Sequence, residues 1–233
     1  LYYNPAKSDV RNLITKGVKE IVTNYNVDGI HFDDYFYPNL GSKYRKNFDR
    51  TEYNSYVRNR KKNNRKYYGI VNWRRQNVDL LISNVYKTVK STKKKVQFGI
   101  SPAGNIDNLY LSWSYYCDVK KWMNSNKYID YICPQIYWTF TNKTCPFKKT
   151  CLRWVKLPRN KNVKLYIGLA GYRAGLSKSQ AKAVSDIGWS KSNTILKREV
   201  LYGRSTKKVS GYVLFSYADL SRKAASKEIA NLK

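Results

Sequence analysis

Residues 28–38 read DGIHFDDYFYP, and this stretch decides how the rest of the chain is interpreted. Its apolar residues predict a short buried strand that ends in two adjacent carboxylates, Asp33 and Asp34. Parallel α/β enzymes place their sites at the carboxyl ends of strands, so this position favours catalysis. The alternative is that one of these residues only caps the next segment. Two adjacent carboxylates are costly to bury unless they are used or paired, which argues against that reading for both together.

The two faces of this strand carry different side chains, because side chains alternate between the faces of a strand. One face is expected to hold His31, Asp33 and Tyr35. The other is expected to hold Ile30, Phe32 and Asp34. The first face therefore combines a histidine, a carboxylate and a tyrosine, while the second is mainly apolar.

Four further apolar runs follow at 96–101, 128–138, 163–169 and 209–215. Segments with helical spacing of apolar residues alternate with the strands, and they cover residues 8–24, 73–90, 177–202 and 221–232. A shorter helix is expected near Leu152. Near-continuous apolar strands that alternate with helices are typical of a parallel sheet covered on both faces. The pattern predicts an α/β fold in a single domain, residues 1–233. A doubly wound sheet and an incomplete (β/α)8 barrel both fit it.

Polar and aromatic side chains recur where the predicted strands end. They are Tyr35, Asn105, Gln135, Tyr137, Trp138, Tyr172 and Tyr217. Rings that stack and amides that donate and accept hydrogen bonds suit a polyhydroxylated ligand. Glycine-rich phosphate loops of the GxGxxG or GxxxxGK type follow none of the strands, which weakens nucleotide-binding readings. The chain has one histidine and no CxxC pair, so we expect neither a metal site nor a cofactor.

The charge balance is strongly positive, with 45 basic and 15 acidic residues and a net charge of +30. Such a field attracts polyanions, and the candidates are nucleic acid, teichoic acid and an anionic membrane surface. The densest basic clusters are at 58–66 and 90–95. An apolar run long enough to span a membrane is not present. Cys145 and Cys151 flank a short loop and would suit a disulfide in a secreted protein, whereas Cys133 is expected to be a buried thiol.

Six motifs in order resemble the glycosyl hydrolase-like 10 family, and they span nearly the whole chain. They begin with residues 3–38, continue through NWRRQNV, FGISPAGN, YIDYICPQIYW and LYIGLAGY, and end with GYVLFSYADL. The resemblance implies a (β/α)8 barrel and, for some members, cleavage of the glycan strands of bacterial peptidoglycan by hydrolysis or lytic transglycosylation. The family barrel begins with about three more β/α units than this chain shows, so residues from those strands are expected to lie outside it.

Glycoside cleavage needs an acid, and usually a second carboxylate about 5–5.5 Å or about 6.5–9.5 Å away. Asp33 is the first catalytic candidate and Asp34 the second, as its partner or alternative. Asp107, which follows the strand at 96–101, is a further candidate for the second carboxylate, and Asp219 an alternative. For substrate binding we expect a set drawn from the strand ends: His31, Tyr35, Asn105, Gln135, Tyr137, Trp138 and Tyr172. Trp138 suits stacking on a sugar or packing on the loop that begins at Cys145.

The sequence thus predicts a secreted or cell-wall-associated bacterial glycosidase that acts on peptidoglycan or a related polysaccharide, and whose basic surface meets anionic wall polymers. The main alternative is a non-catalytic wall-binding module on a barrel scaffold. A nucleic-acid binder is a third possibility that rests on charge and tyrosine content alone, and we expect no specific nucleic-acid partner.

Overall fold

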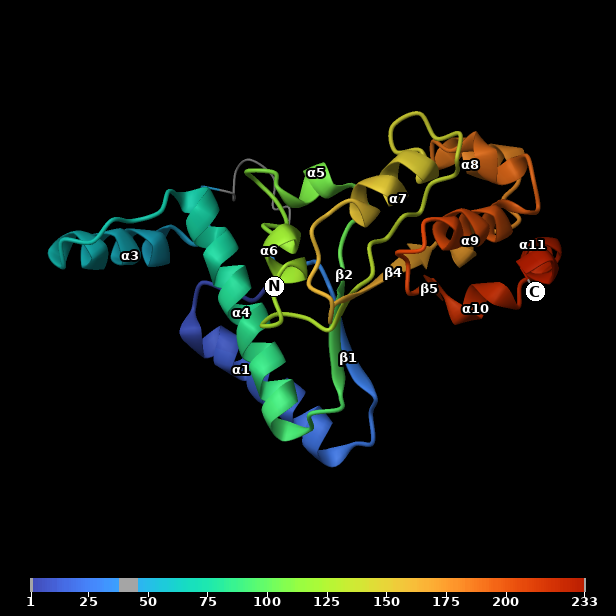
Figure 1. Ribbon diagram of the computed structural model, residues 1–233. Helices are drawn as coiled ribbons and strands as arrows, with labels where there is room; N and C mark the ends of the chain where they lie inside the picture. Colours follow the sequence, from blue (N-terminus) through green and yellow to red (C-terminus); the bar gives the residue numbers. More distant parts are fainter. Residues whose placement is uncertain (1, 38–45, 233) are drawn as a thin grey trace. The chain divides into compact units, whose positions relative to one another are not determined.

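The computed structural model describes residues 2–37 and 46–232. These residues group into two compact units, which are described in turn (Figure 1). Unit 1 consists of Leu1–Ile100 and Asp107–Asp130, and unit 2 of Ser101–Ile106 and Tyr131–Lys233.

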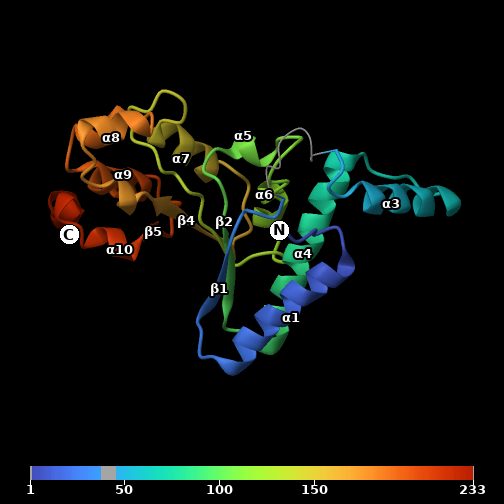
Figure 2. The same ribbon diagram turned by 180° about the vertical axis from the view of Figure 1, so that it is seen from behind.

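Two long helices lie side by side in unit 1, α1 (Ser8–Asn24) and α4 (Ile70–Thr92) (Figures 1 and 2). Helix α1 ends at Asn24, as the sequence predicts. Its first residue is Ser8, and its N-cap is Lys7, which makes no side-chain hydrogen bond there, so neither Ser8 nor Asp9 is the cap. In α4 the apolar residues at three- and four-residue spacing are all buried: Val78, Leu81, Ile82, Val85 and Val89. Their burial explains why this segment is helical, since one continuous apolar stripe faces the core.

The strands of unit 1 are β1 (Gly29–Asp33) and β2 (Gln97–Ser101), whose last residue belongs to unit 2. The amide of Gln97 donates to the carbonyl of Asp28 at 2.9 Å, and the rings of Phe32 and Phe98 meet edge to face at 5.2 Å. Among its described residues, unit 1 also contains α3 (Arg50–Lys62), α6 (Val119–Met123) and, except for its first residue, α5 (Ile106–Leu109). Asp118 caps α6 by accepting the Lys121 amide, and Trp122 and Met123 are fully buried.

Unit 2 contains the strands β3 (Tyr131–Ile132), β4 (Lys164–Leu169) and β5 (Gly211–Leu214), which are parallel. Tyr131 lies opposite Lys164 in the β3–β4 pair, and Tyr166 lies opposite Gly211 in the β4–β5 pair. The α-helices of the unit are α7 (Phe147–Val155), α8 (Lys178–Ala183), α9 (Ile195–Ser205), α10 (Tyr217–Leu220) and α11 (Ser226–Leu232). Three 3-10 helices join them: η1 (Gly171–Arg173), η2 (Ile187–Ser190) and η3 (Lys223–Ala225).

The five parallel strands are arranged in the order β1-β2-β3-β4-β5, so each strand pairs with the next one in the chain. A doubly wound sheet reverses its strand order at a switch point, whereas a (β/α)8 barrel does not. The prediction of an α/β fold is confirmed, and the order decides between its two versions. The described residues supply five of the eight β/α units that a complete barrel contains.

The third strand is much shorter than the apolar run at 128–138 predicts. Pro134 has no amide hydrogen to donate to the sheet, so regular pairing ends before it. Beyond it the chain keeps only isolated parallel bridges, from Gln135 to Ala103 and to Gly168. The long region 177–202 is likewise divided into three helices, with the predicted interruption at Gly188 and Trp189 inside η2.

The cysteines of the described chain are buried thiols, and Cys145 and Cys151 are not joined in a disulfide there. Cys133 is buried as predicted, and desolvation raises the pKa of its thiol to about 12. In the part of the chain that the structure describes, we find no helix with the length and apolar character needed to cross a membrane.

Candidate active site

The two carboxylates at the end of β1 differ in how far they are buried. Asp33 is the last residue of the strand and is exposed, whereas Asp34 follows it and is only 3% exposed. The predicted alternation of faces is confirmed by the burial pattern, since His31 and Tyr35 are exposed and Ile30 is buried. Asp33 therefore stands on the accessible face beside a histidine and a tyrosine.

The carboxylates at the end of β1 affect the pKa values of the histidine and the tyrosine on the accessible face. Partial burial lowers the pKa of His31, and the nearby Asp33 carboxylate offsets part of this decrease. Partial desolvation raises the pKa of Tyr35, and Asp33 and Asp34 raise it further. His31 is thus biased toward the neutral imidazole and Tyr35 toward the neutral phenol, two forms that can donate hydrogen bonds to a sugar or a carboxylate.

Tyr115 is a residue near Asp34 that the sequence reasoning missed. Burial is the largest cause that raises the pKa of Tyr115, and the charges of Asp34 and Tyr35 raise it further. Desolvation is the largest cause that raises the pKa of the fully buried Cys117 thiol, and the charge of Asp34 raises it further. Tyr115 and the next residue, Tyr116, both have positive φ, 61° and 57°. Residues other than glycine rarely adopt this backbone conformation. Strained backbone of this kind is frequent at functional sites, but the sequence carries no signal for it.

The other acidic candidates have different surroundings. Asp107 lies in the first turn of α5, after β2, and is exposed. Asp219 accepts hydrogen bonds from the amide and hydroxyl of Ser216, the N-cap of α10, and so completes a capping box; it also pairs with Arg222 at 3.2 Å. Asp130 accepts the Phe98 amide at 2.7 Å and pairs with Lys90 at 2.6 Å, and these contacts give it a structural role.

Arg74 is held inside unit 1 by a buried carboxylate. Its guanidinium donates to both oxygens of Asp49, at 2.8 and 2.5 Å, and to the hydroxyl of Tyr116 at 2.9 Å. The hydroxyl of Tyr116 in turn donates to the carbonyl of Ser112 at 2.8 Å. This network anchors Tyr116, the neighbour of Tyr115, to α4 and is a structural support for the strained turn.

Unit 2 gathers three aromatic rings at the ends of its strands. Tyr137 and Tyr172 meet edge to face at 5.7 Å, and Phe215 stacks on Tyr137 at 6.3 Å with an interplanar angle of 16°. Phe215 is 57% exposed, so part of this cluster is open to a ligand. Arg173 donates to the Tyr137 carbonyl at 2.6 Å and Arg222 to the Tyr172 carbonyl at 2.7 Å, which fixes the backbone beneath the rings. The sequence carries no functional signal for Phe215, because this residue ends the apolar run that predicts the last strand.

Gln135, Trp138 and Asn105 lie on neighbouring segments of unit 2. The side-chain amide of Gln135 donates to the carbonyl of Ser101 at 3.0 Å, and the backbone amide of Gln135 donates to the carbonyl of Pro102 at 2.9 Å. Gly104 is packed so closely that an added Cβ would lie 2.2 Å from the Gln135 carbonyl oxygen and 2.9 Å from the Trp138 ring. Trp138 is half-buried there, and Asn105 follows Gly104 in the sequence. These residues form a polar and aromatic group, and its role in substrate binding stays a prediction.

Comparison with known proteins identifies the family. The family model described as glycosyl hydrolase-like 10 matches residues 1–186. The chain belongs to the glycosyl hydrolase-like 10 family. Glycosyl hydrolase YngK of Bacillus subtilis is 31% identical over 243 residues, covering 95% of this chain and 43% of its own length. Glycosyl hydrolase DigH of Escherichia coli K12 is 30% identical over 248 residues, covering 99% of this chain and 52% of its own.

The chain therefore spans about half the length of these family relatives. Among solved structures, the PgaB (BpsB) glycoside hydrolase domain from Bordetella bronchiseptica aligns with 98% of this chain and 64% of its own, at 12% identity and a TM-score of 0.49. The structure groups the predicted site residues as two sets: His31, Asp33, Asp34, Tyr35 and Asp107 in unit 1, and Asn105, Gln135, Tyr137, Trp138 and Tyr172 in unit 2. Their roles stay predictions.

Proposed function

We propose that this chain is the catalytic barrel part of a secreted bacterial glycosidase that cleaves the glycan strands of peptidoglycan. The observation that carries the proposal is the pair of carboxylates at the end of β1 in a chain of the glycosyl hydrolase-like 10 family. One of the two is exposed and the other is buried beside a strained turn. The proposal covers hydrolysis and lytic transglycosylation.

Asp33 is the proposed catalytic carboxylate because it is accessible and shares its face with His31 and Tyr35. Its task is to protonate the glycosidic oxygen as the bond breaks. In a hydrolase, a second carboxylate then acts as nucleophile or activates water, and Asp34 and Asp107 are the proposed choices. In lytic transglycosylation the 6-hydroxyl of the sugar attacks instead, so one acid/base group is sufficient.

Substrate binding is assigned to the strand-end residues of unit 2. The cluster of Tyr137, Tyr172 and Phe215 offers aromatic faces, and Gln135 and Asn105 are amides that can bind sugar hydroxyls. Aromatic faces and hydrogen-bonding amides together are what a polyhydroxylated ring requires. The net charge of +30 supports action in an anionic wall.

The test uses the full chain on purified sacculi, with released muropeptides separated by chromatography and identified by mass. Reducing ends indicate hydrolysis, and 1,6-anhydro ends indicate lytic transglycosylation. We expect Asp33→Asn to lower the rate by about 100-fold or more, since a lost acid/base group costs about that much. Asp34→Asn is expected to lower it as well, and Asp28→Asn, an exposed residue that precedes β1, is the matched control.

Unchanged release by both Asp33→Asn and Asp34→Asn would refute the assignment of the site. Sedimentation of the wild-type chain with cell walls, without any product, would instead support the non-catalytic binding module. The two outcomes are read from the same samples, because the pellet reports binding and the supernatant reports cleavage.

A further inference from the structure

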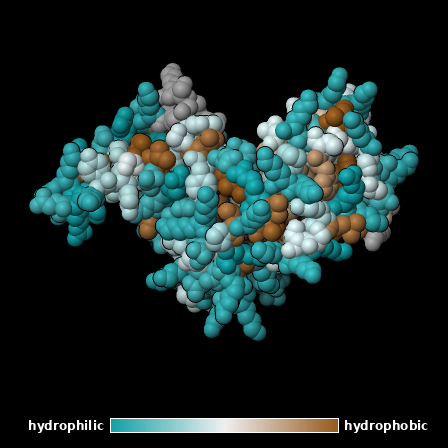
Figure 3. Space-filling model, turned by 45° about the horizontal axis from the view of Figure 1, so that its top comes forward, coloured by the Kyte–Doolittle hydropathy of each residue, from teal (hydrophilic) through white to brown (hydrophobic). Residues whose placement is uncertain are grey.

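Residues 50–68 form a basic hairpin, made of α3 and the segment that returns from it toward α4. Helix α3 has no buried residue, and Figures 1 and 2 show that it projects away from the N-terminal end of α4. Figure 3 shows the outer end of this projection, at the left as in Figure 1, as hydrophilic surface. Because no residue of α3 is buried in the core, the charged part of its surface is free to serve another purpose.

The charge of the basic hairpin is concentrated near its tip. Six cations lie within residues 58–66, with no acidic residue among them: Arg58, Arg60, Lys61, Lys62, Arg65 and Lys66. All except Arg60 are exposed. Within the described ranges, none of these six side chains is in an ion pair. Like charges at this density repel one another, and a negatively charged partner would relieve that repulsion.

The hairpin is an ordered structure, because specific contacts hold its two arms together. The hydroxyl of Tyr53 donates to the carbonyl of Tyr68 at 3.1 Å, and the Tyr68 amide donates to the hydroxyl of Tyr56 at 3.0 Å. Both rings pack on the buried Trp73 of α4, at 5.2 and 5.9 Å.

The tip of the hairpin is closed by its own residues. Asn64 has a φ of 52°, a left-handed conformation that asparagine tolerates. The Arg65 amide donates to the Arg60 carbonyl at 2.8 Å, and the Arg60 side chain donates to the Lys66 carbonyl at 2.7 Å. The basic side chains are therefore presented from a fixed backbone, which lowers the entropy cost of binding.

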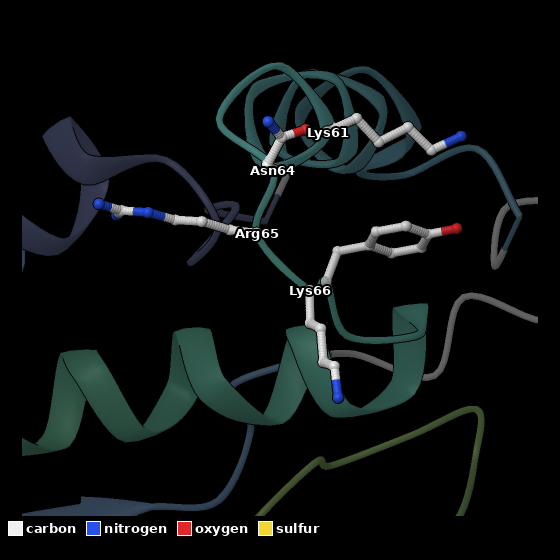
Figure 4. A pocket seen from close by; sticks show the side chains of 5 residues that line it. Lys61, Asn64, Arg65 and Lys66 are labelled. Atoms are coloured by element: carbon white, nitrogen blue, oxygen red, sulfur yellow. The ribbon is translucent and has the colours of Figure 1, made fainter.

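The cations at the tip suit an extended polyanion better than a single small anion. Lys61, Asn64, Arg65, Lys66 and Tyr67 line a shallow hollow, and Figure 4 shows the side chains of Lys61, Arg65 and Lys66 pointing in different directions. A site for one phosphate needs donors that converge on a point. Divergent cations can instead contact successive charges of a chain, which is how backbone phosphates are bound without sequence selection.

The aromatic rings of the hairpin distinguish between kinds of polyanion. Single-stranded nucleic acids are bound by open aromatic faces on which bases stack. Here the rings of Tyr53 and Tyr56 lie on Trp73, and Lys61 lies over the ring of Tyr67 at 5.7 Å. Two of the four tyrosines of the hairpin are thus packed within unit 1, and the other two, Tyr67 and Tyr68, are 47% and 51% exposed, which leaves two open rings beside six cations. We propose that the basic hairpin binds a linear polyol phosphate, a phosphodiester polymer without bases.

The test measures binding of the full chain to poly(glycerol phosphate) by fluorescence anisotropy or calorimetry, across a salt series. We expect the triple variant Lys61→Gln, Arg65→Gln, Lys66→Gln to bind about tenfold more weakly at 100 mM salt, because three charge contacts are removed. The slope of log K against log salt should also become shallower by roughly two. The matched control is Lys87→Gln, Lys94→Gln, Lys95→Gln, which removes the same charge from exposed lysines outside the hairpin.

Equal losses in the two triple variants would overturn the proposal, because binding would then reflect net charge alone. Tighter binding of single-stranded DNA than of poly(glycerol phosphate) at equal phosphate concentration would overturn the choice of polymer. Thermal melts of both variants establish that the fold is intact. The hairpin contains none of the proposed catalytic residues, so either result leaves the glycosidase proposal to its own test.

Discussion

Asp33 and Asp34 are consecutive residues with opposite surroundings. Asp33 closes β1 on its exposed face, whereas Asp34 is 3% exposed and lies in the electrostatic neighbourhood of Tyr115 and Cys117. Strand geometry places their side chains on opposite faces. The two carboxylates are therefore expected to differ in their contribution to stability even if both serve catalysis.

Replacing these two residues by alanine should separate the two contributions. Asp34→Ala removes a buried polar group and is expected to lower Tm by at least about 2 °C, since about 1 kcal/mol corresponds to 2–4 °C in a chain of this size. Asp33→Ala changes an exposed position and should leave Tm nearly unchanged. Circular dichroism melts measure both, and equal losses would contradict the burial difference.

The Arg74–Asp49 pair gives a prediction for stability. Arg74→Met leaves the Asp49 carboxylate buried without its bidentate partner, and such a loss costs about 3–5 kcal/mol. The same change at the exposed Arg58 of α3 should cost little. Urea unfolding followed by tryptophan fluorescence compares the two variants. A loss under 1 kcal/mol for Arg74→Met would show that the pair is not formed as described.

Glu199 predicts a dependence of stability on pH. It is fully buried, and neither carboxylate oxygen has a hydrogen-bond partner among the described residues. Desolvation raises its pKa well above the usual value, Glu228 and Asp186 raise it further, and Arg198 opposes them. Because the folded-state pKa is the higher one, the stabilising contribution is complete below the unfolded pKa of about 4.3 and is lost as pH rises through the folded value.

We therefore expect Glu199→Gln to raise Tm at pH 7–8 by at least about 2 °C and to have a smaller effect near pH 4. The control Glu20→Gln alters an exposed residue of α1 and should show no such pH dependence. Calorimetry at several pH values provides the measurement. A gain in Tm that is the same at pH 4 and pH 8 would rule out ionisation of Glu199 as its cause.

Phe215 predicts an effect on substrate binding. If its exposed ring contacts sugar, Phe215→Ala should raise KM for a soluble glycan about three- to tenfold and change kcat by less than about twofold, because such a contact is made equally in the ground and transition states. Leu201→Ala removes an exposed apolar side chain elsewhere in unit 2 and serves as the control. A fall in kcat with constant KM would instead place Phe215 near the reacting bond.

The alternation of short apolar strands with helices, and the place of Asp33 and Asp34 at a strand end, could be predicted from residue order alone. Both follow from local periodicity, because the burial of one stripe or one face requires a repeat of 3.6 or 2 residues. The same reason explains why α3 is not predicted, since a helix without a buried residue shows no long apolar repeat.

Only the tertiary structure decided which side chains surround those carboxylates. Tyr115 lies about eighty residues beyond Asp34 in the chain, and Arg74 of α4 pairs with Asp49, the N-cap of α3. Such pairs are set by packing between segments distant in sequence, for which a single sequence contains no local pattern. The sequence alone thus determined where polar chemistry stands along the strands, and packing determined which of its groups are buried, exposed or paired.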